Sequence, residues 1–186
     1  MSMVRSLFRP GKGQKVSRYI QAFINGAAAY HGDFVVWDTT APTTQGTSGV
    51  VDGKTLGTND YVYVVQSTAI ATGTNRGAGL IEGRTIGDRN TTTALTDDQL
   101  VIVQTYGVFD DNCFLSASST TRGDILFASS TVAGQLIVSA AVTATDSTND
   151  RNNEWMVGFT LGPTATYTRA AVTNANGATV FIRCDF

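Results

Sequence analysis

The only histidine of the chain, His31, is the first residue to consider for catalysis, because histidine is the commonest general base in enzymes. It stands directly before Gly32-Asp33, where a turn leads into an apolar run. The sequence contains neither the Gly-x-Ser-x-Gly pattern of a hydrolase nucleophile nor the Gly-x-x-x-x-Gly-Lys pattern of a phosphate-binding loop. We therefore predict a protein that is not an enzyme and has no catalytic residues.

One segment has the spacing of a metal-binding loop. Oxygen-bearing side chains occupy every second position from 146 to 154, as at the start of a calcium loop. However, Arg151 stands where such a loop needs a glycine, and Val157 stands where it needs a closing carboxylate. We therefore interpret 146–154 as a polar loop, and we predict no metal and no cofactor.

The two cysteines, Cys113 and Cys184, both lie in apolar, strand-like surroundings. No Cys-x-x-Cys pattern is present, and His31 alone could add a nitrogen ligand. Buried, reduced thiols are the simplest interpretation of such cysteines. We predict that neither cysteine forms a disulfide or a metal site.

Charge is distributed unevenly along the chain. Residues 1–18 carry five basic residues and no acidic one, whereas the remainder holds the other eight bases and all fifteen acids, a net charge of −7. A basic segment on an acidic body favours docking onto a partner, although a solvated tail would look similar. Val4, Leu7 and Phe8 are apolar anchors that a purely solvating tail would not need. We therefore divide the chain into an extended arm, 1–18, and a body, 19–186.

The body shows the composition and spacing of an all-β protein. Hydrophobic residues make up 42% of the chain and charged residues 15%. Threonine favours strands, while glycine and asparagine favour turns. Short apolar runs recur between turn signals, which predicts a compact β-barrel or β-sandwich. The predicted strands are 34–37, 61–66, 80–82, 99–109, 113–115, 125–128, 136–139, 155–161 and 179–183.

The segment 16–24 is ambiguous, because its apolar residues also fall at helical spacing. Asn25-Gly26 is a strong turn signal, so we favour a strand that ends near Ile24 and keep a helix as the alternative. No apolar run approaches the roughly 20 residues that cross a bilayer. The N-terminal residues also lack the apolar stretch of a secretory signal, so we expect a soluble protein made in a cytoplasm.

A Gly-Asp pair occurs twice before an apolar run, at Gly32-Asp33 and at Gly123-Asp124. The second pair follows Arg122, which completes the tripeptide that adhesion receptors read. Glycine supplies a turn conformation that other residues rarely adopt, and aspartate can accept hydrogen bonds from nearby backbone amides. We therefore predict that both pairs form turns that open a core strand, and that the tripeptide has no adhesive role.

The order of these motifs resembles that of the small, β-rich capsid decoration (cement) proteins of tailed bacteriophages. The resemblance extends over most of residues 24–184. The matching motifs are Asn25-Gly26, Gly32-Asp33-Phe34-Val35-Val36-Trp37-Asp38, the run from Asp98 to Phe109, Gly123-Asp124-Ile125-Leu126 with Ala133-Gly134, Val157-Gly158-Phe159-Thr160-Leu161-Gly162 and Val180-Phe181-Ile182-Arg183.

The resemblance implies a structural virion protein that binds the major capsid protein on the outer surface of the head, as a homotrimer, and stabilises the shell. The expected capsid-binding residues are those of the arm, namely Arg5, Leu7, Phe8, Arg9, Lys12, Lys15 and Arg18. No membrane partner is expected, and the acidic body argues against nucleic acid except through the arm. Two alternatives stay open: another virion component, such as a head fibre base or tail protein, and a β-barrel carbohydrate-binding module that uses Trp37 and Trp155.

Overall fold

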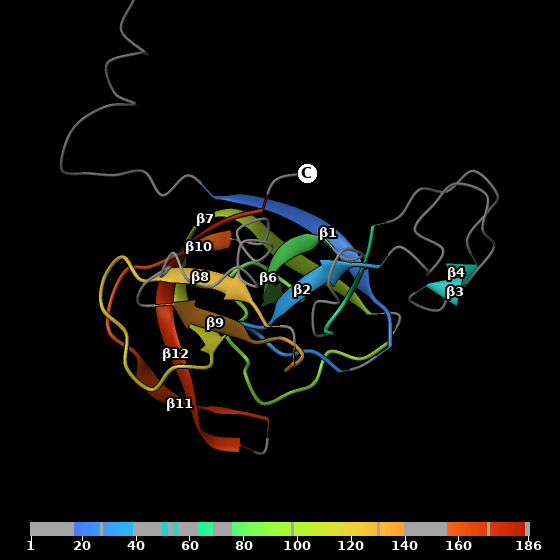
Figure 1. Cartoon of the computed structure of the whole chain (residues 1–186). Coiled ribbons are helices and arrows are strands. Elements are labelled where there is room, and N and C mark those ends of the chain that lie inside the picture. The colour runs from blue at the N-terminus through green and yellow to red at the C-terminus, as the bar shows by residue number, and fades with distance from the viewer. Residues whose placement is uncertain are drawn as a thin grey trace, which may run out of the picture.

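The structure of the chain is a computed structural model, drawn in Figure 1. The residues that it describes are 17–26, 28–38, 50–51, 54–55, 63–68, 76–97, 99–129, 131–139, 156–170 and 172–184.

The described residues form strands and turns and contain no helix, so the predicted all-β class is confirmed. Within these ranges there is accordingly no helix with the length and hydropathy to cross a membrane. The strands are β1 Arg18–Ile24, β2 Phe34–Trp37, β3 Val50–Val51, β4 Lys54–Thr55, β5 Val64–Gln66, β6 Gly77–Gly83, β7 Leu100–Leu115, β8 Ile125–Ala128, β9 Leu136–Ser139, β10 Met156–Thr160, β11 Ala165–Arg169 and β12 Val172–Arg183.

The long strand β7 organises the main sheet, because two closed circuits of strand pairing share it. In the first circuit, the pairing order β1-β5-β2-β6-β7 returns from β7 to β1. In the second circuit, the order β7-β9-β8-β10-β12 returns from β12 to β7. Figure 1 shows β2 and β6 on one side of the body and β8, β9 and β12 on the other. Strand β11 extends the sheet beyond β12, and β3 pairs with β4 separately.

The two circuits use different halves of β7. The first circuit pairs with residues 100–106, whereas β12 pairs with residues 106–115 and β9 with Leu115. Tyr106 is the junction, since it is the register partner of both Arg18 in β1 and Arg183 in β12. Gly107 follows with a φ of 111°, a conformation that favours glycine.

Each circuit has its own hydrophobic cluster, and β2 lies between the two. Val35 belongs to the cluster of the first circuit, together with Val101 and Val103 of β7. Phe34 and Val36 belong to the cluster of the second circuit. Strand β2 is therefore buried on both faces, which explains why its sequence is continuously apolar and does not alternate.

Several strand predictions are confirmed and others need correction. Residues 18–24 form a strand, so the helical alternative was wrong, and strands 34–37, 125–128 and 136–139 have the predicted bounds. The segments 99–109 and 113–115 are not separate strands but parts of β7. Residues 77–79, which were expected in a loop, belong to β6, and β11 was not predicted.

Candidate functional site

Aromatic and arginine side chains gather on the outer face of four strands, β10, β12, β7 and β1. Phe159 of β10 is the register partner of Phe181 in β12, and Arg183 of β12 is that of Tyr106 in β7. Tyr106 in turn pairs with Arg18 of β1. These residues and the exposed Met156 form what we call the aromatic–arginine strip; its members are Arg18, Tyr106, Met156, Phe159, Phe181 and Arg183.

The rings of the strip contact one another in sequence. Phe159 stacks on Phe181 with a centroid distance of 5.1 Å and an interplanar angle of 19°. Phe181 meets Tyr106 edge to face, at 5.3 Å and 81°. The guanidinium carbon of Arg18 lies 5.6 Å from the centroid of the Tyr106 ring, within the range of a cation–π interaction. These contacts join the rings of three strands and the Arg18 guanidinium into one continuous surface.

A register shift in β10 accounts for the outward direction of two of its apolar side chains. Side chains alternate between the two faces of a regular strand, so residues three apart would lie on opposite faces. Met156 and Phe159 are nevertheless 56% and 40% exposed, while Val157 is buried. The register between β10 and β8 shifts between Met156 and Gly158, and such a shift re-aims side chains.

One end of the strip borders an open hollow of about 390 Å³, which is lined by the described residues Met156, Gly158, Phe159, Phe181 and Arg183. At Gly158 a Cβ atom would lie 1.8 Å from the carbonyl oxygen of Phe181, so only glycine allows this approach of β10 to β12. Among the described residues, the lining combines apolar surface with the guanidinium of Arg183 and includes no carboxylate. Such a hollow can accept an apolar side chain beside an anionic group.

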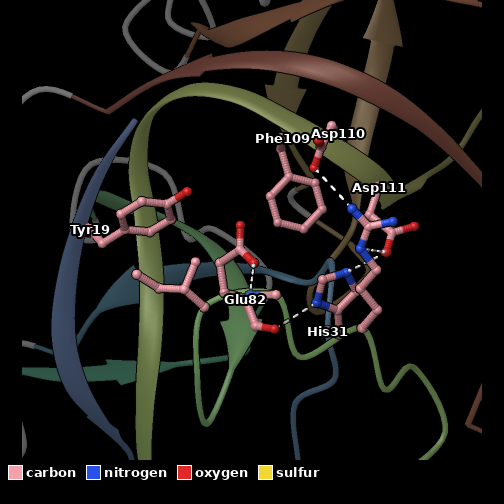
Figure 2. A pocket seen from close by; sticks show the side chains of 9 residues that line it. Tyr19, His31, Glu82, Phe109, Asp110 and Asp111 are labelled. Atoms are coloured by element: carbon pink, nitrogen blue, oxygen red, sulfur yellow. Dashed lines mark hydrogen bonds and ion pairs between the residues drawn. The ribbon is translucent and has the colours of Figure 1, made fainter. Parts of the chain in front are cut away.

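A second feature is the pocket around His31, of about 90 Å³ (Figure 2). The imidazole is 1% exposed and packs 5.2 Å from the Phe109 ring. Its Nδ1 lies 2.7 Å from the carbonyl oxygen of Glu82. A carbonyl can only accept, so Nδ1 donates this hydrogen bond. Nε2 lies 3.3 Å from Oδ2 of Asp111.

Arg89 forms ion pairs with two carboxylates of this pocket. Arg89, whose side chain is 60% exposed, lies 3.4 Å from Asp110 and 3.4 Å from Asp111. The described residues that line the pocket supply no thiol and no aliphatic hydroxyl as a nucleophile. Among the described residues, no three histidine, cysteine, aspartate or glutamate side chains are grouped so that they could hold a metal ion. The contacts of this pocket fix the His31 ring between the Glu82 carbonyl and the Asp111 carboxylate.

A buried ion pair joins the turn before β2 to the end of β11. Asp33 is fully buried, and its two carboxylate oxygens accept hydrogen bonds of 2.6 Å from Nε and Nη2 of Arg169. The guanidinium carbon lies 4.8 Å from the Tyr30 ring centroid and 4.3 Å from that of Phe114. Burial raises the pKa of Asp33, although the hydrogen bonds from Arg169 act in the opposite direction. This pair anchors the β11–β12 hairpin to the body.

The two Gly-Asp pairs form the same turn, as predicted. Asp33 accepts a hydrogen bond from the Tyr30 amide at 3.0 Å, and Asp124 accepts one from the Thr121 amide at 2.7 Å. The aspartate amides donate back to the Tyr30 and Thr121 carbonyls. Gly32 and Gly123 have φ values of 83° and 96°. Both pairs are therefore architectural, and Arg122 is an exposed residue inside the second turn.

Arg18 is the one predicted arm residue that the structure describes. It lies within β1 and belongs to the strip. Arg5, Leu7, Phe8, Arg9, Lys12 and Lys15 lie outside the described residues, as do the 146–154 segment and Trp155. Cys113 and Cys184 are both buried, as predicted.

Sequence reasoning did not identify the remaining members of the strip. Tyr106, Phe159 and Phe181 lie in predicted strands that are far apart in the sequence, and strand pairing alone brings them together. The signal was weak, because an outward aromatic residue in a strand looks like a core residue until the register is known.

Comparisons with known proteins give no family for this chain: no family model, no curated protein and no solved structure matches it.

Proposed function

We propose that the chain is a structural, non-enzymatic virion protein that binds the outside of the major capsid shell and cements a phage head. The observation that carries the proposal is the aromatic–arginine strip together with its place in the chain. Arg18, the last of the five basic residues of 1–18, begins β1 and contacts Tyr106 of the strip. Arg18 thus joins the basic segment, in sequence, to an exposed apolar surface.

The two parts suit a binding role in different ways. Basic residues steer a chain toward an acidic surface and depend on salt, whereas exposed aromatic residues supply most of the energy of a protein interface. A capsid repeats the same surface many times, so a homotrimer that presents three strips and three arms would gain avidity by engaging several subunits at once. We place the protein, after its synthesis in the host cytoplasm, on the outer surface of the virion.

Mixing purified protein with undecorated phage heads tests this function. The full chain is expected to sediment with the heads and to raise the temperature at which they release DNA. A chain that lacks residues 1–16 keeps β1 intact and is expected to decorate the heads more weakly, with a smaller dependence on salt. Failure of the full chain to bind heads would sink the proposal, and undiminished decoration by the truncated chain would remove the arm from it.

Immunoelectron microscopy of intact particles separates this function from that of a head fibre base or tail protein. Label distributed over the head supports cementing, whereas label at the tail or at a single fibre position supports another virion component.

A carbohydrate-binding module is the second candidate, and one observation favours it. Trp37 and Tyr63 contact each other with a ring-centroid distance of 5.4 Å, and Tyr63 is 59% exposed. Exposed aromatic pairs offer an apolar face and a polar edge to a ligand. A glycan array decides: specific binding that Tyr63→Ala abolishes would support this candidate, and an array without signals would exclude it.

A further inference from the structure

We propose that the hollow of the aromatic–arginine strip is a docking site for an acidic protein segment that inserts one apolar side chain. The proposal deepens the proposed function, on which it rests for the identity of the partner. In this proposal the body of the protein makes the contact that selects the partner, and the arm contributes electrostatic steering.

The shape and lining of the hollow indicate which kind of side chain it can accept. Its volume of about 390 Å³ exceeds what a single aromatic or aliphatic side chain needs, and its floor and walls are Met156, Gly158, Phe159 and Phe181. Large apolar side chains that stay 56% and 40% exposed, beside ordered rings, are typical of an interaction surface. The expected guest is therefore an apolar side chain.

Charge defines the chemistry around that guest. Arg183 lines the hollow, Arg18 lies at the other end of the strip, and none of the described residues that line the hollow or form the strip is acidic. The adjoining segment 1–18 adds no acidic residue and has a charge of +5. An acidic partner complements all of these cations, since opposite potentials across an interface favour both association and register.

The same charges argue against the other occupants. The chain's own N-terminal segment is basic, so its bases would face Arg18 and Arg183. A second copy in a symmetric contact would bring the arginines of two identical strips together. Single-stranded nucleic acid needs open ring faces for stacking, but Phe159 and Phe181 stack on each other, and the remainder of the chain beyond residue 18 has a net charge of −7.

Fluorescence anisotropy with a labelled synthetic peptide tests the docking site. The probe has one phenylalanine between runs of glutamate, and three further probes replace the phenylalanine by serine, the glutamates by lysine, or the peptide by an oligothymidine. We expect the full chain to bind the first probe. Its affinity for the serine probe should be at least about tenfold lower, as for the loss of a central hot-spot contact. Binding of the first probe should weaken as salt is raised from low to physiological ionic strength.

Exposed residues supply the test variants and their matched controls. Phe159→Ser and Arg183→Gln alter the hollow, whereas Val132→Ser and Arg84→Gln remove a similarly exposed apolar and basic side chain elsewhere. We expect Phe159→Ser to weaken binding of the first probe about tenfold and Arg183→Gln about fivefold. The controls should bind within about twofold of the unaltered chain, and circular dichroism should show that all four variants are folded.

Four outcomes would overturn the docking site. They are equal binding of the phenylalanine and serine probes, unchanged binding by Phe159→Ser, tighter binding of the oligothymidine, and a change in the mass measured by light scattering when Phe159→Ser is introduced. The third would indicate nucleic acid and the fourth a second copy of the chain as the occupant.

The same variants, mixed with undecorated heads, separate this inference from the proposed function. If the full chain decorates heads and Phe159→Ser does so equally well, the docking site is wrong and the cementing function stands. If the full chain binds the phenylalanine probe but no heads, the function is wrong and the docking site stands with another acidic partner.

Discussion

At the scale of single residues, Asp33 and Arg169 form a buried ion pair with two hydrogen bonds. A buried pair of this kind adds little net stability when intact, but the removal of one partner leaves the other charge without compensation. Both carboxylate oxygens of Asp33 depend on the same guanidinium, and that carboxylate is fully buried. The cost of breaking the pair should therefore depend on whether Asp33 can take up a proton.

We predict that Arg169→Met lowers the free energy of unfolding by about 3–5 kcal/mol at pH 7. Burial already raises the pKa of Asp33, and loss of the guanidinium raises it further. The folded variant then binds a proton more tightly than the unfolded chain, so its stability rises as the pH falls, and the loss should be smaller at pH 5. Urea unfolding at both pH values measures this.

Arg89→Met is the control, because Arg89 is 60% exposed and its ion pairs have distances of 3.4 Å. Its loss should cost at most about 1 kcal/mol. A cost for Arg169→Met that equals that of Arg89→Met, or that does not change with pH, would contradict this account of the buried pair.

The buried thiol of Cys113 gives a second prediction at this scale. Burial raises its pKa to about 12, so about one thiol in ten thousand is ionised at pH 8. In a Cys184→Ser background, Cys113 should not react with a disulfide reagent at pH 8 while the protein is folded, and it should react completely in denaturant. Rapid reaction in the folded protein would show that the interior near Cys113 opens readily.

At the scale of elements, the repeated Gly-Asp turn offers an internal comparison. A Cβ at position 32 would lie 2.1 Å from the carbonyl oxygen of Asn112, whereas a Cβ at position 123 meets nothing within 4 Å. The backbone conformation is similar in the two turns. The pair therefore separates the conformational cost of a side chain from its steric cost.

We predict that Gly123→Ala lowers the free energy of unfolding by about 1 kcal/mol, the cost of a left-handed φ. Gly32→Ala should lower it by about 3 kcal/mol or more, because the added methyl group also displaces the β7 backbone. Chemical denaturation of the two variants side by side gives both values. Equal losses would mean that Asn112 moves away at no cost.

Particular elements also show how far the sequence predicts the structure. The strands 34–37, 125–128 and 136–139 were predictable because glycine turns delimit apolar runs there. Strand β7 was divided in the prediction because Asp110 and Asp111 interrupt its apolar pattern, yet both residues line the His31 pocket at the surface, and the backbone continues. Strand β11 was missed because its exposed residues have no apolar periodicity.

At the scale of the whole molecule, the shared strand β7 couples the two circuits. The clusters of the two circuits are separate, but each draws residues from β7, and β2 contributes to both. A change in one cluster should therefore be felt throughout the described body. Small proteins with such continuous contacts usually unfold in one transition.

We predict that Leu126→Ala, in the cluster of the second circuit, lowers the free energy of unfolding by about 2–5 kcal/mol. Trp37 packs against the cluster of the first circuit, so its fluorescence reports on the opposite side of β7. In a Trp155→Phe background, the midpoints from Trp37 fluorescence and from circular dichroism should fall together. If Leu126→Ala leaves the midpoint of the Trp37 fluorescence transition unchanged, the two circuits unfold independently.

The candidate site also depends on the whole molecule, because its residues come from strands that are distant in the sequence. For this reason its residues were not predictable. The sequence identified the basic segment by composition, and it identified the strands that carry Tyr106, Phe159 and Phe181. It did not contain the register that places these rings beside one another, because that register depends on closure of both circuits through β7. Local patterns can predict which residues lie in strands but not which distant strands become neighbours.

The position of β7 in the chain also sets an order of events during synthesis on the ribosome. All strands of the first circuit, including its half of β7, precede residue 107, so this circuit can close while the rest of the chain is still being made. The C-terminal half of β7 must wait for β12, the last strand, to be released. A nascent chain therefore presents an unpaired apolar strand from the synthesis of residues 107–115 until β12 is released, and this is the interval in which chaperones have most to protect.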